Sequence, residues 1–193
     1  MLLLRIIRWV RKTIFIRLNI FFSIIVFYFK KTILGFENAN KYLSSIDKSI
    51  VFYLLKLNGA TVGENCDIER GIVFHNCSDY RNLIIGNNCH IGKECFFDLK
   101  DKIILHDNVV ISMRTVIITH LDMSRSLLNT IYPKTHSPVV IESDVYIGAS
   151  CTVLQGVTLR KSCCIGAGSL VNKDVGEGLL FGGVPAVFIK KII

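Results

Sequence analysis

An aliphatic or aromatic residue returns at every sixth position through most of the second two-thirds of this chain of 193 residues. These key residues fall into five blocks of three. They are Val62, Ile68 and Phe74; Ile85, Ile91 and Phe97; Leu105, Ile111 and Ile117; Ile141, Ile147 and Val153; and Leu159, Ile165 and Val171. A period of six excludes an α-helical face, because helical faces recur every 3.6 residues.

The period predicts a short strand and a tight bend, three times per turn, so that parallel strands stack into a triangular prism. The fourth position after a key residue is small or β-branched in most repeats, as at Cys66, Cys95 and Val109. The exceptions, Asp101 and Leu121, stand at block ends where extra residues enter the chain. We therefore expect a mainly β fold, a parallel β-helix of about five coils over residues 60–180.

One insert between the blocks is much longer than the others. Eighteen extra residues separate the third and fourth blocks and form a loop at about residues 121–140. A loop of this length in a regular solenoid predicts either an interaction arm or a cover over an active site.

The repeat also explains the cysteines. Five of the seven occupy the fourth position after a key residue, where a small buried side chain is needed, and no CxxC pair exists. Only Cys77 and Cys164 lie outside that position. We expect packed, reduced thiols, which favour a cytoplasmic compartment.

Basic charge is concentrated at the N-terminus. The chain has a formal charge of +8, and residues 1–31 contribute seven basic side chains and no acid: Arg5, Arg8, Arg11, Lys12, Arg17, Lys30 and Lys31. The prism is therefore nearly neutral, which argues against nucleic-acid binding. Basic residues beside apolar ones favour contact with an anionic membrane surface.

The N-terminal arm, residues 1–36, is expected to be membrane-associated without spanning the bilayer. Its longest uncharged run, residues 18–29, makes a helix of roughly 18 Å, whereas the hydrocarbon core is about 30 Å thick. We expect an uncleaved helix in or re-entering the inner face of the membrane. The alternatives are a helix packed on the protein or another subunit, a true span, and a signal peptide.

A helical lead-in over residues 37–59 is expected between the arm and the prism. Apolar residues recur at helical spacing from Lys41 to Leu57, which predicts one helix there. Asn58 and Gly59 supply its stop signal.

Several stretches of the prism resemble the hexapeptide-repeat acyltransferases, and the resemblance covers about residues 60–193. The stretches are IESDVYIGAS at 141–150, LQGVT at 154–158, IGAGSLVNKDV at 165–175 and GVPA at 183–186. The resemblance implies a left-handed parallel β-helix, a homotrimer, acetyl-CoA as co-substrate, and a C-terminal turn and short helix over 181–193. Within the family the chain is most similar to sugar O-acetyltransferases of surface-polysaccharide and lipopolysaccharide gene clusters.

His120 is the candidate catalytic residue among five histidines. It lies at the mouth of the long insert, and the resemblance places the catalytic histidine there. A neutral imidazole suits the removal of a hydroxyl proton near pH 7. Asp98 lies one coil away and Asp122 lies beside it in the loop, so either could orient His120 or bind the acceptor. Among the other histidines, His136 in the insert either covers the site or is an ordinary loop residue.

For the acyl donor, the resemblance implies a groove along the second half of the prism, lined by an aromatic residue and small residues and completed by basic residues for the nucleotide phosphates. These cofactor-binding candidates are Tyr146, Ala149, Ala167, Gly168, Lys173 and Lys190. Small side chains allow a ligand to approach the coil closely. Either lysine could equally be a solvated surface charge.

The expected function is transfer of acetyl from acetyl-CoA to a hydroxyl of a surface-glycan sugar, with His120 as general base. Three alternatives remain: an acceptor that is an amino sugar, serine or a xenobiotic alcohol; a non-catalytic membrane-bound assembly protein; and a zinc enzyme on the same scaffold. The zinc enzyme needs two histidines five residues apart. The separations here are 15, 16, 14 and 16, so we expect no metal site.

Overall fold

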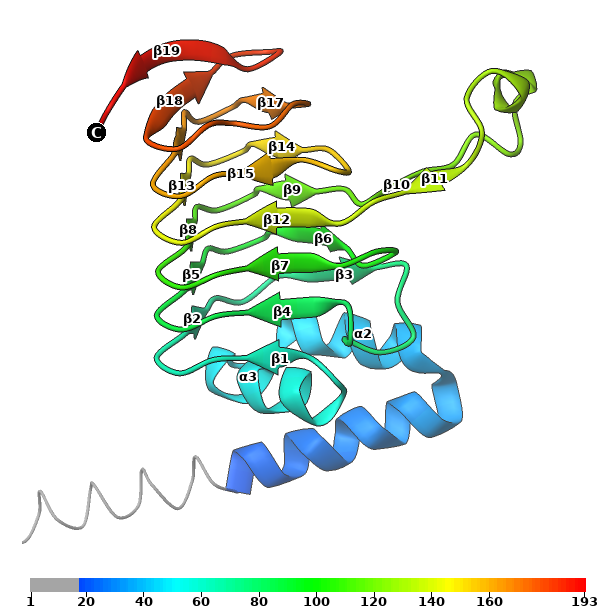
Figure 1. Ribbon diagram of the computed structural model, residues 1–193. Helices are drawn as coiled ribbons and strands as arrows, with labels where there is room; N and C mark the ends of the chain where they lie inside the picture. Colours follow the sequence, from blue (N-terminus) through cyan, green and yellow to red (C-terminus); the bar gives the residue numbers. More distant parts are fainter. Residues whose placement is uncertain (1–17) are drawn as a thin grey trace, which may run out of the picture.

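The computed structural model describes residues 18–193, whose short strands stack into a three-sided prism with helices at one end and a β-hairpin at the other (Figure 1). Residues 1–17 of the predicted arm, and the five basic side chains among them, lie outside the described residues. Each face of the prism is one sheet, and its strands are parallel except for β19 at the edge of the second face.

The first face consists of β1 (Thr61–Val62), β4 (Leu83–Ile85), β7 (Ile103–Leu105), β12 (Val139–Ile141) and β15 (Thr158–Leu159). The second consists of β2 (Asp67–Ile68), β5 (His90–Ile91), β8 (Val110–Ile111), β13 (Tyr146–Ile147), β16 (Cys164–Ile165), β18 (Leu179–Gly182) and β19 (Val187–Lys191). The third consists of β3 (Val73–His75), β6 (Phe96–Asp98), β9 (Val116–Ile117), β14 (Thr152–Val153) and β17 (Leu170–Val171).

The predicted repeat is confirmed. All fifteen key residues lie in strands, and none of them exposes more than 4% of its surface. Phe97 stacks in register between Phe74 below and Ile117 above, as expected for coils of eighteen residues once the inserts between the blocks are left out. The winding is consistent with the left-handed β-helix. It continues beyond the expected five coils into a sixth, partial turn, where Val175 bridges to Leu159 and β18 pairs with β16.

The corners of the prism explain why the chain can turn every six residues. The third residue after eleven of the key residues has a positive φ, between 55° and 83°. These residues are Asn65, Gly71, Asn88, Glu94, Asn108, Arg114, Asp144, Ser150, Gly156, Ser162 and Gly168. Asparagine and glycine are the residues that adopt this left-handed conformation at least cost. The third residue is not left-handed at the last corner of most blocks, where the inserts enter.

Four of the five cysteines predicted to be packed inside are buried, the fifth, Cys66, is partly buried, and all seven are free thiols. Cys89, Cys95, Cys151 and Cys163 are buried. Cys89 and Cys151 each donate a hydrogen bond from Sγ to a backbone carbonyl of the next coil at 3.1 Å. A thiol in this position therefore fills a small space and satisfies a carbonyl at the bend.

The helical lead-in differs from the single helix predicted over residues 41–57. The structure has two helices, α2 (Phe36–Ser45) and α3 (Lys48–Leu57), separated at Ile46 and Asp47. Asp47 starts α3 as its N-cap, accepting a hydrogen bond from the Ser49 backbone N–H at 3.0 Å. The apolar spacing continued through the break, so the spacing alone could not reveal it.

A further helix crosses beneath α2 and α3 (Figure 1). It runs over residues 18–29 and continues as the π-helical turn η1 (Lys30–Leu34). One of its faces packs on the body through the fully buried Phe27. Among residues 18–193, none of the helices has the length and apolar character needed to cross a bilayer.

The expected C-terminal helix over residues 187–193 is wrong. Residues 187–191 instead form β19, which pairs antiparallel with β18 and covers the last coil. An open sheet edge offers hydrogen bonds to any extended segment, and the β-branched residues of this segment suit a strand.

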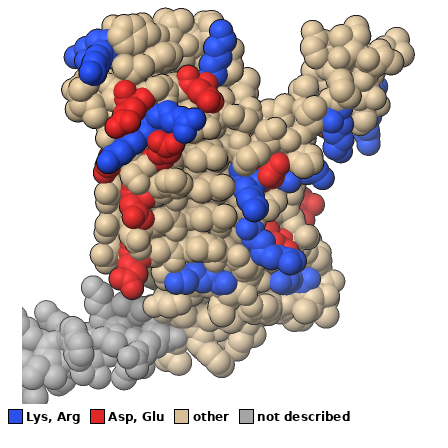
Figure 2. Space-filling view, in the orientation of Figure 1, with Lys and Arg blue, Asp and Glu red and all other residues tan. Residues whose placement is uncertain are grey.

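The long insert leaves the prism as an antiparallel arm (Figure 1). It is formed by β10 (His120–Leu121) and β11 (Thr135–His136), with the 3₁₀-helix η2 (Leu127–Thr130) near its tip. Figure 2 shows the tip as mostly uncharged, with basic side chains on its lower side. Leu127, at the tip, exposes 92% of its surface.

Candidate active site

His120 and Asp98 form a hydrogen-bonded pair where the arm leaves the prism. His120 is the first residue of β10 and Asp98 is the last residue of β6, one coil below. The distance from His120 Nδ1 to Asp98 Oδ2 is 2.6 Å. Asp98 is only 1% exposed, whereas the His120 side chain keeps 24% of its surface accessible. The pair therefore joins a buried carboxylate to an imidazole that a ligand can reach.

The carboxylate sets the tautomer of the ring. Asp98 accepts a hydrogen bond from Nδ1–H, so Nε2 of the neutral imidazole carries a lone pair and can accept a proton. This is the arrangement of a general base oriented by an acid. The expectation that stacking brings Asp98 to His120 is met by this geometry.

Two further residues hold Asp98 in place. The Asn76 amide donates to Oδ1 at 2.8 Å. Thr119 donates to Oδ2 from its backbone N–H at 2.8 Å and from its hydroxyl at 3.0 Å. Burial alone would raise the pKa of Asp98, but the hydrogen bonds from His120, Asn76 and Thr119 outweigh it and hold that pKa below its ordinary value. Asp98 is thus ionised and fixed.

Asp122, the other candidate acid, has different partners. Its carboxylate accepts from Lys134 Nζ at 2.6 Å and from the Ser124 backbone N–H at 3.0 Å, both within the arm. The hydrogen bond from Lys134, followed by those from Ser124, lowers the pKa of Asp122. Of the two acids, Asp98 contacts the imidazole, whereas Asp122 contacts residues of the arm.

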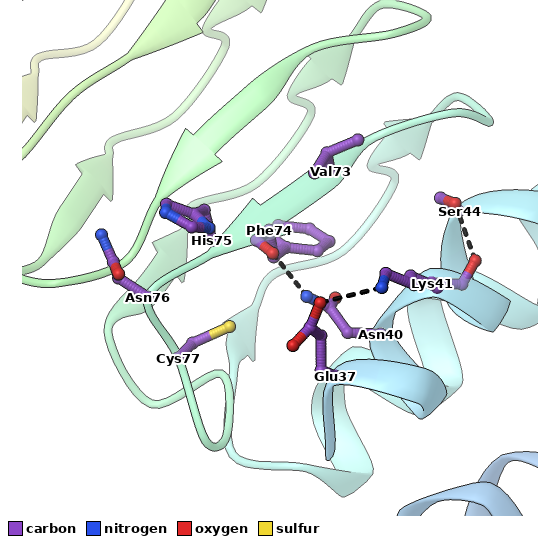
Figure 3. Close-up of a pocket in the computed structure, with 9 residues that line it drawn as sticks. All are labelled: Glu37, Asn40, Lys41, Ser44, Val73, Phe74, His75, Asn76 and Cys77. Carbon is purple, nitrogen blue, oxygen red and sulfur yellow. Dashed lines mark hydrogen bonds and ion pairs between the residues drawn. The ribbon is translucent and has the colours of Figure 1, made fainter. Parts of the chain in front are cut away.

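Two hollows meet at Asn76. One, of about 370 Å³, lies between α2 and β3 and is lined by Glu37, Asn40 and Lys41 on one side and by β3 on the other, with Asn76 at its edge pointing away from α2 (Figure 3). The other, of about 380 Å³, lies beside Leu99 and Lys100. The Asn76 amide also lies 3.4 Å from both ring nitrogens of His120. Asn76 thus lines both hollows and contacts His120, which itself lines neither of them.

Within the described residues, none of the other four histidines pairs with a carboxylate as buried as Asp98. His75 packs against Phe96 with ring centroids 5.6 Å apart, and His106 borders a hollow at the corner between the first and second faces. His90 lies 3.2 Å from the exposed Asp67, and His136 lies 2.6 Å from Asp101. Across residues 18–193, no three His, Cys, Asp or Glu side chains come together as metal ligands would.

The six residues predicted to bind the acyl donor do not all lie together. Ala149, Ala167 and Gly168 gather at the corner between the second and third faces, where the Gly168 N–H donates to the Ala149 carbonyl at 2.8 Å. Tyr146 lies half exposed on the second face, with its hydroxyl 3.2 Å from Ser112 Oγ. Lys190 lies on β19.

Close stacking explains the small residues at that corner. A side chain at Gly148 would place its Cβ 2.5 Å from the Ala167 backbone nitrogen. Lys173 instead follows β17, on the corner that carries His120 two coils below. The structure thus groups the small residues and sets the two lysines apart from them.

The sequence reasoning missed Asn76, Thr119 and Gln155 at the corner of His120. Gln155 follows β14, one coil above, and its amide donates to Thr135 Oγ1 at 2.9 Å. Its Oε1 is the one buried side-chain polar atom in residues 18–193 that has no hydrogen-bond partner. The coil register places all three at the corner after the third-face strands, but their contacts depend on side-chain directions that the spacing does not specify.

Comparison with known proteins supports the repeat. The family model for the hexapeptide repeat of succinyl-transferase matches residues 82–118 and 138–173, on either side of the arm. A 2,3,4,5-tetrahydropyridine-2,6-dicarboxylate N-acetyltransferase from Staphylococcus aureus is 40% identical over 72 residues, which are 37% of this chain and 30% of that protein. The chain thus matches less than a third of the length of these curated relatives.

Solved structures agree over a larger part of the chain. A maltose O-acetyltransferase from Clostridium difficile 630 has a TM-score of 0.69 and 26% identity, covering 81% of this chain and 86% of that one. A galactoside acetyltransferase in complex with coenzyme A has a TM-score of 0.69 and 25% identity over 81% and 80%. AntD, an N-acyltransferase from Bacillus cereus in complex with dTDP and coenzyme A, shares the fold at 22% identity and a TM-score of 0.59 over 69% and 74%.

Proposed function

Because the chain belongs to the hexapeptide-repeat acyltransferase family, we propose that it transfers acetyl from acetyl-CoA to a hydroxyl of a surface-glycan sugar. The observation that carries the proposal is the buried Asp98 carboxylate holding the accessible His120 imidazole at 2.6 Å. Structural neighbours named as maltose and galactoside acetyltransferases support a sugar acceptor.

In the proposed reaction, Nε2 of His120 takes the proton of the acceptor hydroxyl as its oxygen attacks the thioester carbonyl. A C–O bond forms and the C–S bond breaks, and the imidazolium returns the proton to the departing sulfur. Asp98 keeps the ring in the reactive tautomer and stabilises its positive charge while the proton is on it. Thr119 and Asn76 hold Asp98 in place.

For the donor, we propose that coenzyme A lies along the corner formed by Ala149, Ala167 and Gly168. Gly168 has a φ of 71°, and no heavy atom lies within 4 Å of the place where a Cβ would project from it, so the backbone there is open to a ligand. Tyr146 would flank the groove, and Lys173 and Lys190 would offer charge to the nucleotide phosphates.

An N-acyl transfer is the second candidate, because the family relatives include N-acetyltransferases. The test is to incubate the protein with acetyl-CoA and a panel of sugars, amino sugars, serine and alcohols, while measuring the release of free thiol. Mass spectrometry of the product would then show one added acetyl group on oxygen. Acetylation only of amines would favour the second candidate, and the absence of any coenzyme A binding would leave a non-catalytic assembly protein.

We also propose that the working form is a homotrimer. The arm tip exposes Leu127, Leu128, Ile131 and Tyr132 away from its own prism, a cluster suited to cover by another copy. Light scattering should give three chains. Replacing Leu127 and Ile131 with serine should lower that mass, whereas a monomeric wild-type protein would contradict the proposal.

We further propose that the N-terminal helix lies on an anionic membrane surface. The face opposite Phe27 exposes between 48% and 67% of Leu18, Phe21, Phe22, Ile25, Phe29 and Ile33. The seventeen preceding residues carry five basic and no acidic side chains, which complement anionic lipid.

Flotation with vesicles tests this contact. Vesicles containing phosphatidylglycerol should carry the protein, and neutral phosphatidylcholine vesicles should carry much less. Replacing Phe21 and Phe22 with serine should weaken the binding. If that double variant instead dissociates an oligomer, the exposed face belongs to an interface between copies.

A further inference from the structure

A second imidazole–carboxylate pair lies directly beside the first. His136 Nδ1 is 2.6 Å from Asp101 Oδ2, the same distance that separates His120 from Asp98. The His136 side chain is 56% exposed. No step of the proposed reaction uses this pair.

The arm brings the two histidines opposite each other. His120 and His136 are register partners of the antiparallel strands β10 and β11. The next residues along, Thr119 and Ser137, share a backbone hydrogen bond of 3.0 Å. The two histidines are therefore the non-hydrogen-bonded pair, in which Cα atoms are about 4.5 Å apart and both side chains leave the same face of the ribbon.

Thr119 also connects the two acidic residues. The Thr119 hydroxyl donates to Asp98 and accepts from the Asp101 backbone N–H at 2.9 Å. One buried threonine thus holds the carboxylate of Asp98 and the backbone of Asp101. Each acid holds its histidine at Nδ1, which leaves a lone pair on both Nε2 atoms.

We infer that His136 accepts a hydrogen bond from a second hydroxyl of the acceptor, next to the hydroxyl that His120 deprotonates. The acceptor is then a sugar with hydroxyl groups on adjacent carbons, since two neighbouring acceptor nitrogens match two neighbouring O–H donors. This inference rests on the proposed function and names its acceptor class. His136 is an acceptor-binding residue and takes no proton in the reaction.

The test combines a protein change with a substrate change. Initial rates are measured for wild type and His136→Ala, each with a sugar that the wild type acetylates and with its deoxy analogue lacking the adjacent hydroxyl. Either change alone should raise the KM for the acceptor about fivefold to tenfold with little loss of kcat. Both changes together should cost no more than one, because they remove the same hydrogen bond.

Controls separate binding from folding. His106→Ala removes an exposed histidine remote from the arm and should leave both constants unchanged. His136→Gln retains an acceptor oxygen and should recover part of the affinity. Thermal unfolding should be the same for all variants, since His136 is exposed.

Two results would overturn the inference: an unchanged KM in His136→Ala, or a loss that is equally large with the deoxy sugar. If the wild type acetylates amines and no sugar hydroxyl, the proposed O-acetylation fails as well. If it acetylates the diol and the double change is additive, only the role of His136 fails.

Discussion

The coils of the prism and the arm that leaves them use similar apolar residues in opposite ways. In the coils, Phe97 is fully buried and packs edge-on against Phe74, with ring centroids 6.0 Å apart. In the arm, Leu127 is almost fully exposed. The coils are stabilised by their own neighbours along the chain, whereas the arm offers its apolar tip to something outside it.

The candidate site lies on the boundary between these two regions. Asp98 belongs to the rigid stack and His120 to the first residues of the arm. This contrast indicates that the repeat provides a fixed, buried carboxylate, and that a break in the repeat is needed to present an imidazole to a ligand. A regular coil without the insert would bury or solvate that position.

The greatest change that we expect concerns the stability of the two regions. Phe97→Ala should lower the free energy of unfolding by about 3–5 kcal/mol, since it removes a buried ring from a continuous core. Leu127→Ala should change it by no more than about 0.5 kcal/mol. Urea unfolding of both variants measures the contrast.

Protein concentration sharpens this comparison. A result in which Leu127→Ala lowers the free energy of unfolding by more than this at high protein concentration only would indicate that the arm contacts another copy of the chain. Equal losses in the two variants at every concentration would contradict the distinction between coil and arm.

The next effect concerns the two candidate acids. Asp98→Asn should reduce acetyl transfer by about a hundredfold, because the ring loses the partner that fixes its tautomer. It should also destabilise the fold by about 1.5–3 kcal/mol, because Thr119 and His120 lose a charged acceptor. Asp122→Asn is the matched control, and its transfer rate should stay close to that of the wild type. A reversal of the two results would move the orienting role to Asp122.

A smaller effect concerns the pH dependence of stability, which we expect to arise in the coils and not in the arm. Burial raises the pKa of Cys89 and Cys95 to about 11 and that of Cys163 to about 12, whereas residues 119–138 contain no cysteine. Above pH 9 the unfolded chain loses thiol protons that the folded coils keep, so the folded state binds more protons and stability falls as pH rises.

Each buried thiol contributes at most about 1.4 kcal/mol per pH unit between pH 9 and 11. The free energy of unfolding, measured over that range, should therefore decline, and Cys95→Ala should make the decline less steep. An unchanged slope in the variant would contradict the assignment of this loss to the thiols.

Much of the prism followed from the sequence because its register is periodic. The positions of Ile111, Ile147 and Ile165 on one face were predictable from counting alone, and so was the nearness of Asp98 to His120. Stacking repeats one local geometry, so a sequence offset of one coil becomes a fixed displacement in space.

The parts that were not predictable lie where the period ends. The break at Asp47 depends on a side-chain cap within a continuous apolar pattern, and β19 depends on the open edge of β18. The pairing of His136 with His120 required the path of the arm, which no spacing specifies. The roles of Asn76 and Thr119 likewise depend on side-chain directions at the corner.

The role of His120 as general base is tested most directly by measuring acetyl transfer and thermal unfolding side by side in wild type, His120→Ala and His106→Ala. We expect His120→Ala to slow transfer by about 10²- to 10⁴-fold while its unfolding temperature stays within a few degrees of wild type. His106→Ala should match the wild type in both measurements. A folded His120→Ala variant with full activity would show that the imidazole is not the base.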